Sequence, residues 1–87
     1  MTILIDDIKF NNENEFFFLV NESFKDKEIL DLDSFYNVLT ENNPEIEIIL
    51  SDFDTVEESS KPFASKVYKM LHEVKAVNPN FTLTMFG

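Results

Sequence analysis

The sequence predicts an α/β fold in which three to four helices pack on a small sheet of three parallel strands. Three short apolar segments, at residues 2–10, 45–50 and 81–86, are typical of strands, and helical patterns separate them. Strands that are separated by helices need crossover connections, which favour parallel pairing. A hydrophobic content of 44% with ten phenylalanines provides a core for one domain, which we expect to span residues 1–87. Because the sheet is small, we expect the helices mainly on one of its sides.

The first expected strand ends at Asn11 and Asn12, and a helix follows. Asn12 and Glu15 have the spacing of a capping box, in which each side chain accepts a backbone N–H of the first turn. The expected helix, residues 13–24, places most of its apolar side chains on one face and leaves Phe18 off that face. The run of three phenylalanines would also suit a strand, but the polar residues on both sides favour the helix.

The next segment, residues 31–40, predicts a short acidic helix with one buried face. Its apolar side chains have the spacing i, i+3, i+4 and i+7: Leu32, Phe35, Tyr36 and Leu39. Asp31 precedes them, where a carboxylate accepts a backbone N–H and meets the positive end of the helix dipole. The outer side carries Asp33, Asn37 and Glu41, with Tyr36 at its edge. We interpret this helix as the surface that the rest of the chain supports.

A break and a second strand follow the acidic helix. Residues 41–44 interrupt the pattern, because the residue before a proline avoids the helical conformation and asparagine favours turns. The segment 45–50 alternates at first and is apolar on both faces later, as expected for a strand. The loop 51–59 that follows has little periodicity, although residues 56–59 would suit a helical turn.

The last third of the chain contains the clearest helical pattern. Ser60 is its expected cap, and Pro62 is tolerated in the first turn. The apolar stripe consists of Phe63, Val67, Met70, Leu71 and Val74. Asn78 and Pro79 end this helix, and residues 81–86 alternate apolar residues with threonine as a final strand.

The charge of the chain restricts its partners. Seventeen acidic residues against seven basic ones give a formal net charge of −10. This balance disfavours direct binding of nucleic acid and of an anionic membrane, both of which need lysine and arginine. It suits a protein partner with a basic functional surface, because complementary fields steer the encounter. Solubility alone is an equally good explanation of this net charge. We expect the free protein to be a monomer.

The residue types also limit the chemistry that the chain can perform. Cysteine is missing, which excludes disulfides and thiolate metal sites, and the one glycine is the final residue, which excludes a glycine-rich phosphate loop. The single histidine, His72, is expected at the surface beside the apolar stripe. The chain begins without a secretory leader and contains no long apolar run, so the expected location is the cytoplasm.

Two aspartate patterns suggest an activity that the chain is too short to support. The segment Asp52-Phe53-Asp54-Thr55-Val56 follows an apolar strand and resembles the start of haloacid-dehalogenase-type phosphatases. Those enzymes need further motifs on a much longer sheet.

The spacings Asp31/Asp33 and Asp52/Asp54 resemble calcium or magnesium ligands, but the glycine and the distal glutamate of a calcium loop are missing. We therefore expect no enzyme, no metal and no cofactor.

The order of elements and several local segments resemble the barstar family of intracellular ribonuclease inhibitors. The family's recognition helix reads Asn-Leu-Asp-Ala-Leu-Trp-Asp-Cys-Leu-Thr, and residues 31–40 are similar to it without a gap. A proline-led strand follows in both, with Pro44 in this chain. The end of the last helix, Glu-Ala-Lys-Ala in the family, is similar to residues 73–76, and a terminal strand with alternating threonines follows at 81–86. The resemblance spans nearly the whole chain.

The resemblance implies a barstar-like fold and a protein that blocks the basic active-site cleft of a ribonuclease toxin. The implied partner-binding residues are those of the acidic helix and one on the last helix: Asp31, Asp33, Tyr36, Asn37, Glu41 and Glu73. Asp33 matches the first acid of the recognition helix and Glu73 matches the acid of the last helix. Tyr36 stands at the family's tryptophan and Asp31 at an asparagine.

Other positions depart from the family pattern. Asn37 stands at the second acid of the recognition helix, and an amide lacks the charge-assisted part of a hydrogen bond. Residues 27–29 replace the family's Tyr-Tyr-Gly, which introduces Lys27, and Asn42 replaces a tryptophan. These departures favour an alternative in which the fold is kept and the target differs. The chain would then be an acidic interaction module that mimics nucleic acid, of the kind that phages use as inhibitors.

Overall fold

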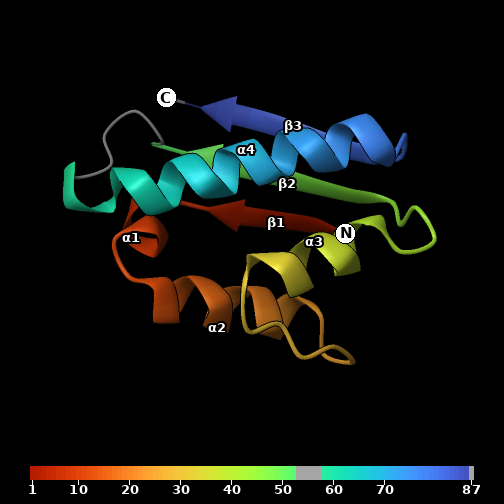
Figure 1. The fold of residues 1–87 in the computed structure, drawn as a ribbon, viewed down its shortest axis with the longest axis horizontal. Helices are drawn as coiled ribbons and strands as arrows, with labels where there is room; N and C mark the ends of the chain where they lie inside the picture. The colour runs from red at the N-terminus through yellow and green to blue at the C-terminus, as the bar shows by residue number, and fades with distance from the viewer. Residues whose placement is uncertain (53–57, 87) are drawn as a thin grey trace.

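Three parallel strands, with helices packed on one of their faces, make up the fold (Figure 1). The computed structural model describes residues 1–52 and 58–86, and the side chains of these residues except Asp7 and Ile8. The strands are β1 (Thr2–Ile5), β2 (Ile46–Ser51) and β3 (Phe81–Phe86). The helices are α1 (Asp7–Phe10), α2 (Glu13–Ser23), α3 (Leu32–Thr40) and α4 (Lys61–Val77), and a 3₁₀ turn, η2 (Glu58–Ser60), precedes α4. The predicted α/β class with a three-stranded parallel sheet is confirmed.

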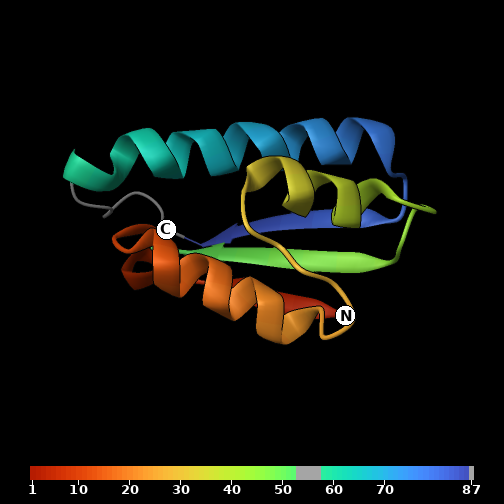
Figure 2. The same ribbon diagram turned by 60° about the horizontal axis from the view of Figure 1, so that its bottom comes forward.

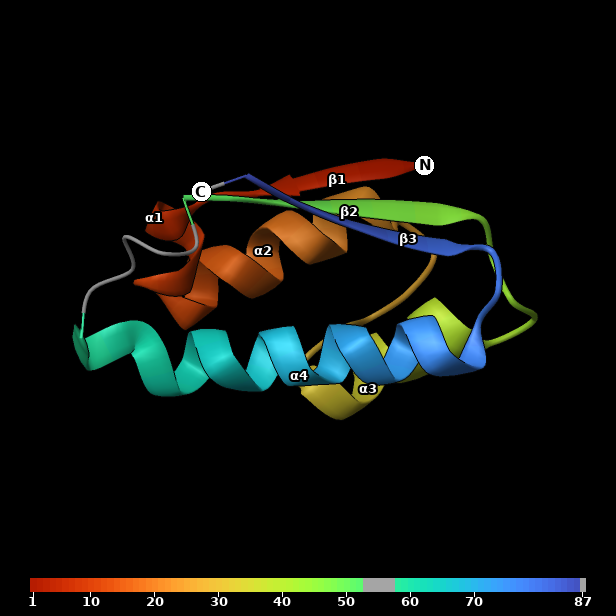
Figure 3. The ribbon, with the colours of Figure 1, turned by 90° about the horizontal axis from the view of Figure 1, so that it is seen from above.

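The strand order explains why the helices share one face of the sheet. β2 lies between β1 and β3, and both pairs are parallel. Crossovers between parallel strands keep one hand, so an order that advances in one direction places both connections on the same face. Figure 3 shows α2, α3 and α4 together on that face. In the paired register, Ile3, Ile48 and Leu83 lie side by side and point toward the helices. The predicted one-sided arrangement is confirmed.

A cluster of phenylalanines joins the helices to one another. Phe16 of α2 is fully buried, and its ring centroid lies 6.1 Å from that of Phe10 in α1. The centroids of Phe35 in α3 and Phe63 in α4 lie 5.9 Å and 5.2 Å from it. Burial of one phenylalanine contributes about 1.5–3 kcal/mol, and edge-to-face contacts add to this. Phe18 is 66% exposed, as the sequence predicts.

The first strand is shorter than the prediction. β1 ends at Ile5, and residues 7–10, expected as strand, form the single helical turn α1. Asp6 starts this turn, because its backbone carbonyl and its Oδ1 both accept the N–H of Lys9, at 3.1 Å and 3.4 Å. The turn carries Phe10 into the core. The apolar pattern does not predict this helical turn, because Phe10 would be buried in a strand as well as in a helix.

The start of α4 also differs in part from the prediction. Ser60 precedes the helix as expected, but its side chain makes no capping hydrogen bond, so the predicted cap is wrong. Its backbone is helical, with φ −101° and ψ −7°, because η2 runs directly into α4. Pro62 lies in the first turn as predicted. Phe63 is half-buried, and Ala64 completes the buried stripe with Val67, Met70, Leu71 and Val74.

The remaining predicted elements are confirmed within a residue at their ends. Asn12 Oδ1 accepts the N–H groups of Asn14 and Glu15 at 3.0 Å and 3.3 Å, which establishes the predicted start of α2. His72 is exposed, and its ring lies 4.4 Å from that of Tyr68. Residues 53–57, which include most of the phosphatase-like segment, lie outside the described residues. Along the described ranges, no helix is both long enough and apolar enough to cross a bilayer.

A buried amide connects the ends of α3 and α4. Asn78 is 0% exposed, and its Nδ2 donates to the carbonyl oxygens of Leu39 at 3.0 Å and Pro44 at 2.8 Å. Its Oδ1 accepts the N–H of Asn80 at 2.9 Å. The sequence predicts Asn78 only as the end of a helix. In the structure it also fixes where α3 ends and where β2 begins.

Candidate functional site

The acidic helix α3 begins with a reciprocal pair of hydrogen bonds. Asp31 Oδ1 accepts the N–H of Ser34 at 2.8 Å, and Ser34 Oγ accepts the N–H of Asp31 at 3.1 Å. The same hydroxyl oxygen accepts the N–H of Leu30 at 3.1 Å. The bond from the Ser34 backbone, reinforced by the Ser34 hydroxyl, lowers the pKa of Asp31 because it favours the charged form. The predicted cap is confirmed, and the Asp31 side chain remains exposed.

A second asparagine fixes the segment that leads into α3. Asn21 of α2 donates from Nδ2 to the carbonyl oxygen of Ile29 and accepts the N–H of Ile29 at Oδ1, both at 2.7 Å. A further bond joins its Nδ2 to the carbonyl oxygen of Phe17 at 2.9 Å. The Ile29 side chain is 0% exposed and anchors the segment in the core. The start of α3 is therefore held by α2 as well as by its own cap.

The predicted outer side of α3 faces solvent. Asp33, Asn37 and Glu41 are exposed, and Tyr36 is half-buried against the core. Glu41 ends the helix, and its N–H donates to the carbonyl oxygen of Asn37 at 2.9 Å. Tyr36 therefore covers part of the core and is partly accessible, and its contact with a partner stays a prediction.

Glu73 lies on the neighbouring helix. α3 and the second half of α4 lie side by side, and Asn78 joins their carboxyl ends (Figure 2). The Glu73 side chain is exposed near the end of α4. Glu73 is accessible to a partner, and its membership of the same site as the acids of α3 stays a prediction.

The structure brings two of the predicted residues into one hollow, which we call the α3 hollow. Its volume is about 320 Å³, and it lies where α2, α3 and α4 meet. The lining residues are Glu13, Phe17, Leu30, Asp31, Leu32, Asp33, Phe63 and Lys66. The rings of Phe17 and Phe63 are 6.1 Å apart, and Leu30 is 70% exposed. Acids at the edge of an apolar and aromatic floor suit a cationic side chain with an aliphatic stem.

The acids of this surface have few charged partners within the molecule. Among residues 1–52 and 58–86, the single ion pair joins the exposed side chains of Lys61 and Glu58 at 3.4 Å. Asp33 makes no side-chain hydrogen bond to any residue in these ranges. Lys66 lines the α3 hollow but forms no ion pair with another described residue. The carboxylates are therefore available to a cation from outside.

Six residues of the hollow were not predicted as site residues: Glu13, Phe17, Leu30, Leu32, Phe63 and Lys66. Phe17 and Phe63 follow the helical patterns of core residues, and only their half-burial distinguishes them. Glu13 is in the first turn of α2, where an acid also suits the helix dipole. Nothing in the local sequence signals that three helix segments meet there, because the meeting depends on how α2 and α4 cross.

Comparison of the chain with models of protein families, with curated proteins and with solved structures finds no match.

Proposed function

We propose that this chain is a barstar-like inhibitor or immunity protein, which blocks the basic active-site cleft of a ribonuclease toxin with the acidic surface of α3. One observation carries the proposal. The exposed acids of α3 have no cationic partner among the described residues, while the helix itself is held firmly in place. The resemblance of residues 31–40 to the barstar recognition helix gives the target class.

The proposed mechanism is occupation of a phosphate-binding cleft. A ribonuclease binds its substrate with arginine, lysine and histidine side chains, and carboxylates form charge-assisted hydrogen bonds with the same groups. Asp33 supplies the charge at the centre of the contact, and Asp31 supplies a second one whose lowered pKa keeps it ionised. Binding costs less free energy when the contact surface is already ordered. The cap at Ser34 and the bonds of Asn21 and Asn78 provide that order.

Binding to a basic, guanyl-specific ribonuclease tests the proposal. Asp33→Asn removes the charge and keeps the shape of the side chain, and we expect a loss of affinity of about tenfold or more in calorimetric titration. Inhibition of RNA cleavage should weaken by a similar factor. The matched control is Asp26→Asn, an exposed aspartate in the segment between α2 and α3, which we expect to change the affinity less than about threefold.

Two results would contradict the proposal. An equal loss at Asp33 and Asp26 would indicate attraction by overall charge and would remove the site assignment. Failure of the unmodified chain to bind a panel of basic ribonucleases would remove the ribonuclease as the target.

A second candidate keeps the fold and changes the partner. Asn37, in the middle of the exposed surface of α3, is neutral, and the exposed Lys27 precedes the helix. Both positions depart from the contact surface of the barstar family, which favours a target other than a ribonuclease. The second candidate is therefore an acidic module that mimics nucleic acid and blocks a DNA-binding protein. Displacement of short duplex DNA from such a protein, with the ribonuclease unaffected, would select this candidate.

A further inference from the structure

The face of the sheet opposite the helices carries no covering element among the described residues (Figure 3). We call it the open sheet face. The register assigns to it Thr2, Leu4, Glu47, Ile49, Ser51, Thr82, Thr84 and Phe86. All-parallel sheets are almost always covered on both faces. A parallel sheet with one uncovered face is therefore a surface on which a partner is expected.

One half of the open sheet face is apolar. Leu4 on β1 is 57% exposed and Phe86 on β3 is 59% exposed. Ile49 on β2 pairs with Leu4 and Thr84 and is half-buried, and Phe86 pairs with Ser51 at the end of β2. Exposed apolar side chains that gather on one face are typical of interaction surfaces. Contact with water is unfavourable for these side chains, so an apolar partner would stabilise the face.

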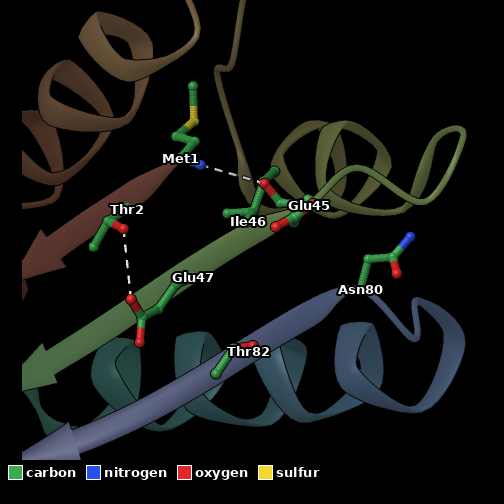
Figure 4. A pocket seen from close by; sticks show the side chains of 7 residues that line it. All are labelled: Met1, Thr2, Glu45, Ile46, Glu47, Asn80 and Thr82. Atoms are coloured by element: carbon green, nitrogen blue, oxygen red, sulfur yellow. Dashed lines mark hydrogen bonds between the residues drawn. The ribbon is translucent and has the colours of Figure 1, made fainter.

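The other half holds one fixed carboxylate. Glu47 lies on the central strand, and its two oxygens accept from the hydroxyls of Thr2 at 3.5 Å and Thr84 at 3.2 Å, on the two flanking strands. Figure 4 shows Glu47 with Thr2 and Thr82 beside a hollow of about 310 Å³, which Glu45 and Asn80 also line. The amino group of Met1 bonds to the backbone oxygen of Glu45 at 3.4 Å and forms no ion pair with a carboxylate that the structure describes.

We propose that the open sheet face binds an amphipathic segment of a protein partner that carries a lysine or arginine among apolar side chains. A segment that covers Leu4, Ile49 and Phe86 must be apolar. The same segment desolvates Glu47, and a buried carboxylate is costly unless a cation pairs with it. The occupant therefore combines both properties, with the cation over the centre of the sheet.

Charge selects this occupant over two others. A second copy of the chain would bring another Glu47 and a further net charge of −10 to the face, and like charges repel. An anionic membrane would be repelled for the same reason. The open sheet face lies on the opposite side of the sheet from α3, so this inference is independent of the proposed ribonuclease contact.

The test uses a synthetic amphipathic helical peptide of about 18 residues, which is long enough to cross the sheet. Its apolar face consists of leucines around one central arginine, and a second peptide has glutamate in place of the arginine. In a nuclear magnetic resonance titration of the ¹⁵N-labelled chain, we expect the arginine peptide to shift the amide signals of β1, β2 and β3. We expect it to bind at least about tenfold more tightly than the glutamate peptide.

Variants of the chain make the result specific. Glu47→Gln keeps acceptors for both threonine hydroxyls and should reduce the preference for arginine to less than about threefold. Leu4→Ser should weaken both peptides, whereas Asp33→Asn on α3 should leave both affinities unchanged. Unaltered amide spectra outside the substituted strand will show that each variant is folded.

Three outcomes would overturn the inference. Shifts confined to the helices would place the contact elsewhere, and an unchanged preference in Glu47→Gln would remove the carboxylate from it. A chain that dimerises through β1, β2 and β3 without peptide would show that the occupant is a second copy. If the chain fails to bind a ribonuclease but still binds the peptide at the open sheet face, the proposed function is contradicted and this inference is not.

Discussion

The amide of Asn78 allows a quantitative prediction about the attachment of α3. Asn78→Ala removes two bonds donated to Leu39 and Pro44 and one accepted from Asn80. Each hydrogen bond contributes about 1 kcal/mol net, and a buried partner left unsatisfied costs about 1–3 kcal/mol. Asn78 is 0% exposed and Pro44 is half-buried, so we expect water to replace the lost bond only in part, at the Pro44 carbonyl. We therefore expect a loss of about 3–4 kcal/mol, a large share of the stability of a small domain.

Urea denaturation followed by circular dichroism measures this loss, and Asn80→Ala is the matched control. Asn80 is exposed, and its side chain makes one bond, from Nδ2 to the carbonyl oxygen of Asn43 at 2.9 Å. Its removal should cost less than about 1 kcal/mol. A loss below about 1 kcal/mol at Asn78, or equal losses at both positions, would refute the claim that the buried amide fixes α3.

The remaining predictions concern the helix start and the core. The pKa of Asp31 is lowered in the folded state, so the contribution of this carboxylate to stability is present above its ordinary pKa and is lost as the pH falls through the lowered value. The unfolding midpoint of Asp31→Asn should therefore depend less on pH in the acidic range than that of the unmodified chain. Phe16→Ala should reduce the free energy of unfolding by about 3–5 kcal/mol, because the ring contacts phenylalanines of three other helices. Phe18→Ala, at the exposed neighbour, should change it by no more than about 0.5 kcal/mol, and a similar loss at both positions would contradict the assigned core.

The sequence predicts those elements whose pattern is strong and local. The acidic helix, its cap at Asp31 and the long helix after Pro62 follow from apolar spacing and from residues that act within one turn. The parallel pairing follows from the alternation of strands and helices, and the one-sided arrangement follows from the small number of strands. The helical turn after Ile5 was missed because burial of Phe10 fits strand and helix equally. The direct passage of η2 into α4 was missed because Ser60 is a common cap residue.

The site was predicted less completely than the fold. The exposed residues of α3 follow from the helix pattern, since the positions between the apolar ones must point outward. The α3 hollow could not be predicted, because its floor combines Phe17 and Phe63 from helices that are far apart in the sequence. The roles of Asn21 and Asn78 were missed for a related reason. Each side chain bonds to backbone groups of a segment whose position only the tertiary structure determines.

The central position of β2 has a consequence for how the chain folds. Thr2 and Glu47, paired across β1 and β2, are 45 residues apart, and Glu47 and Thr84 are 37 residues apart. Such distant pairs give the sheet a high contact order, which slows folding relative to a helical bundle of the same length. Neither outer strand has a neighbour until β2 is in place. Substitutions in β2 should therefore slow folding itself, whereas substitutions in β1 or β3 should chiefly accelerate unfolding.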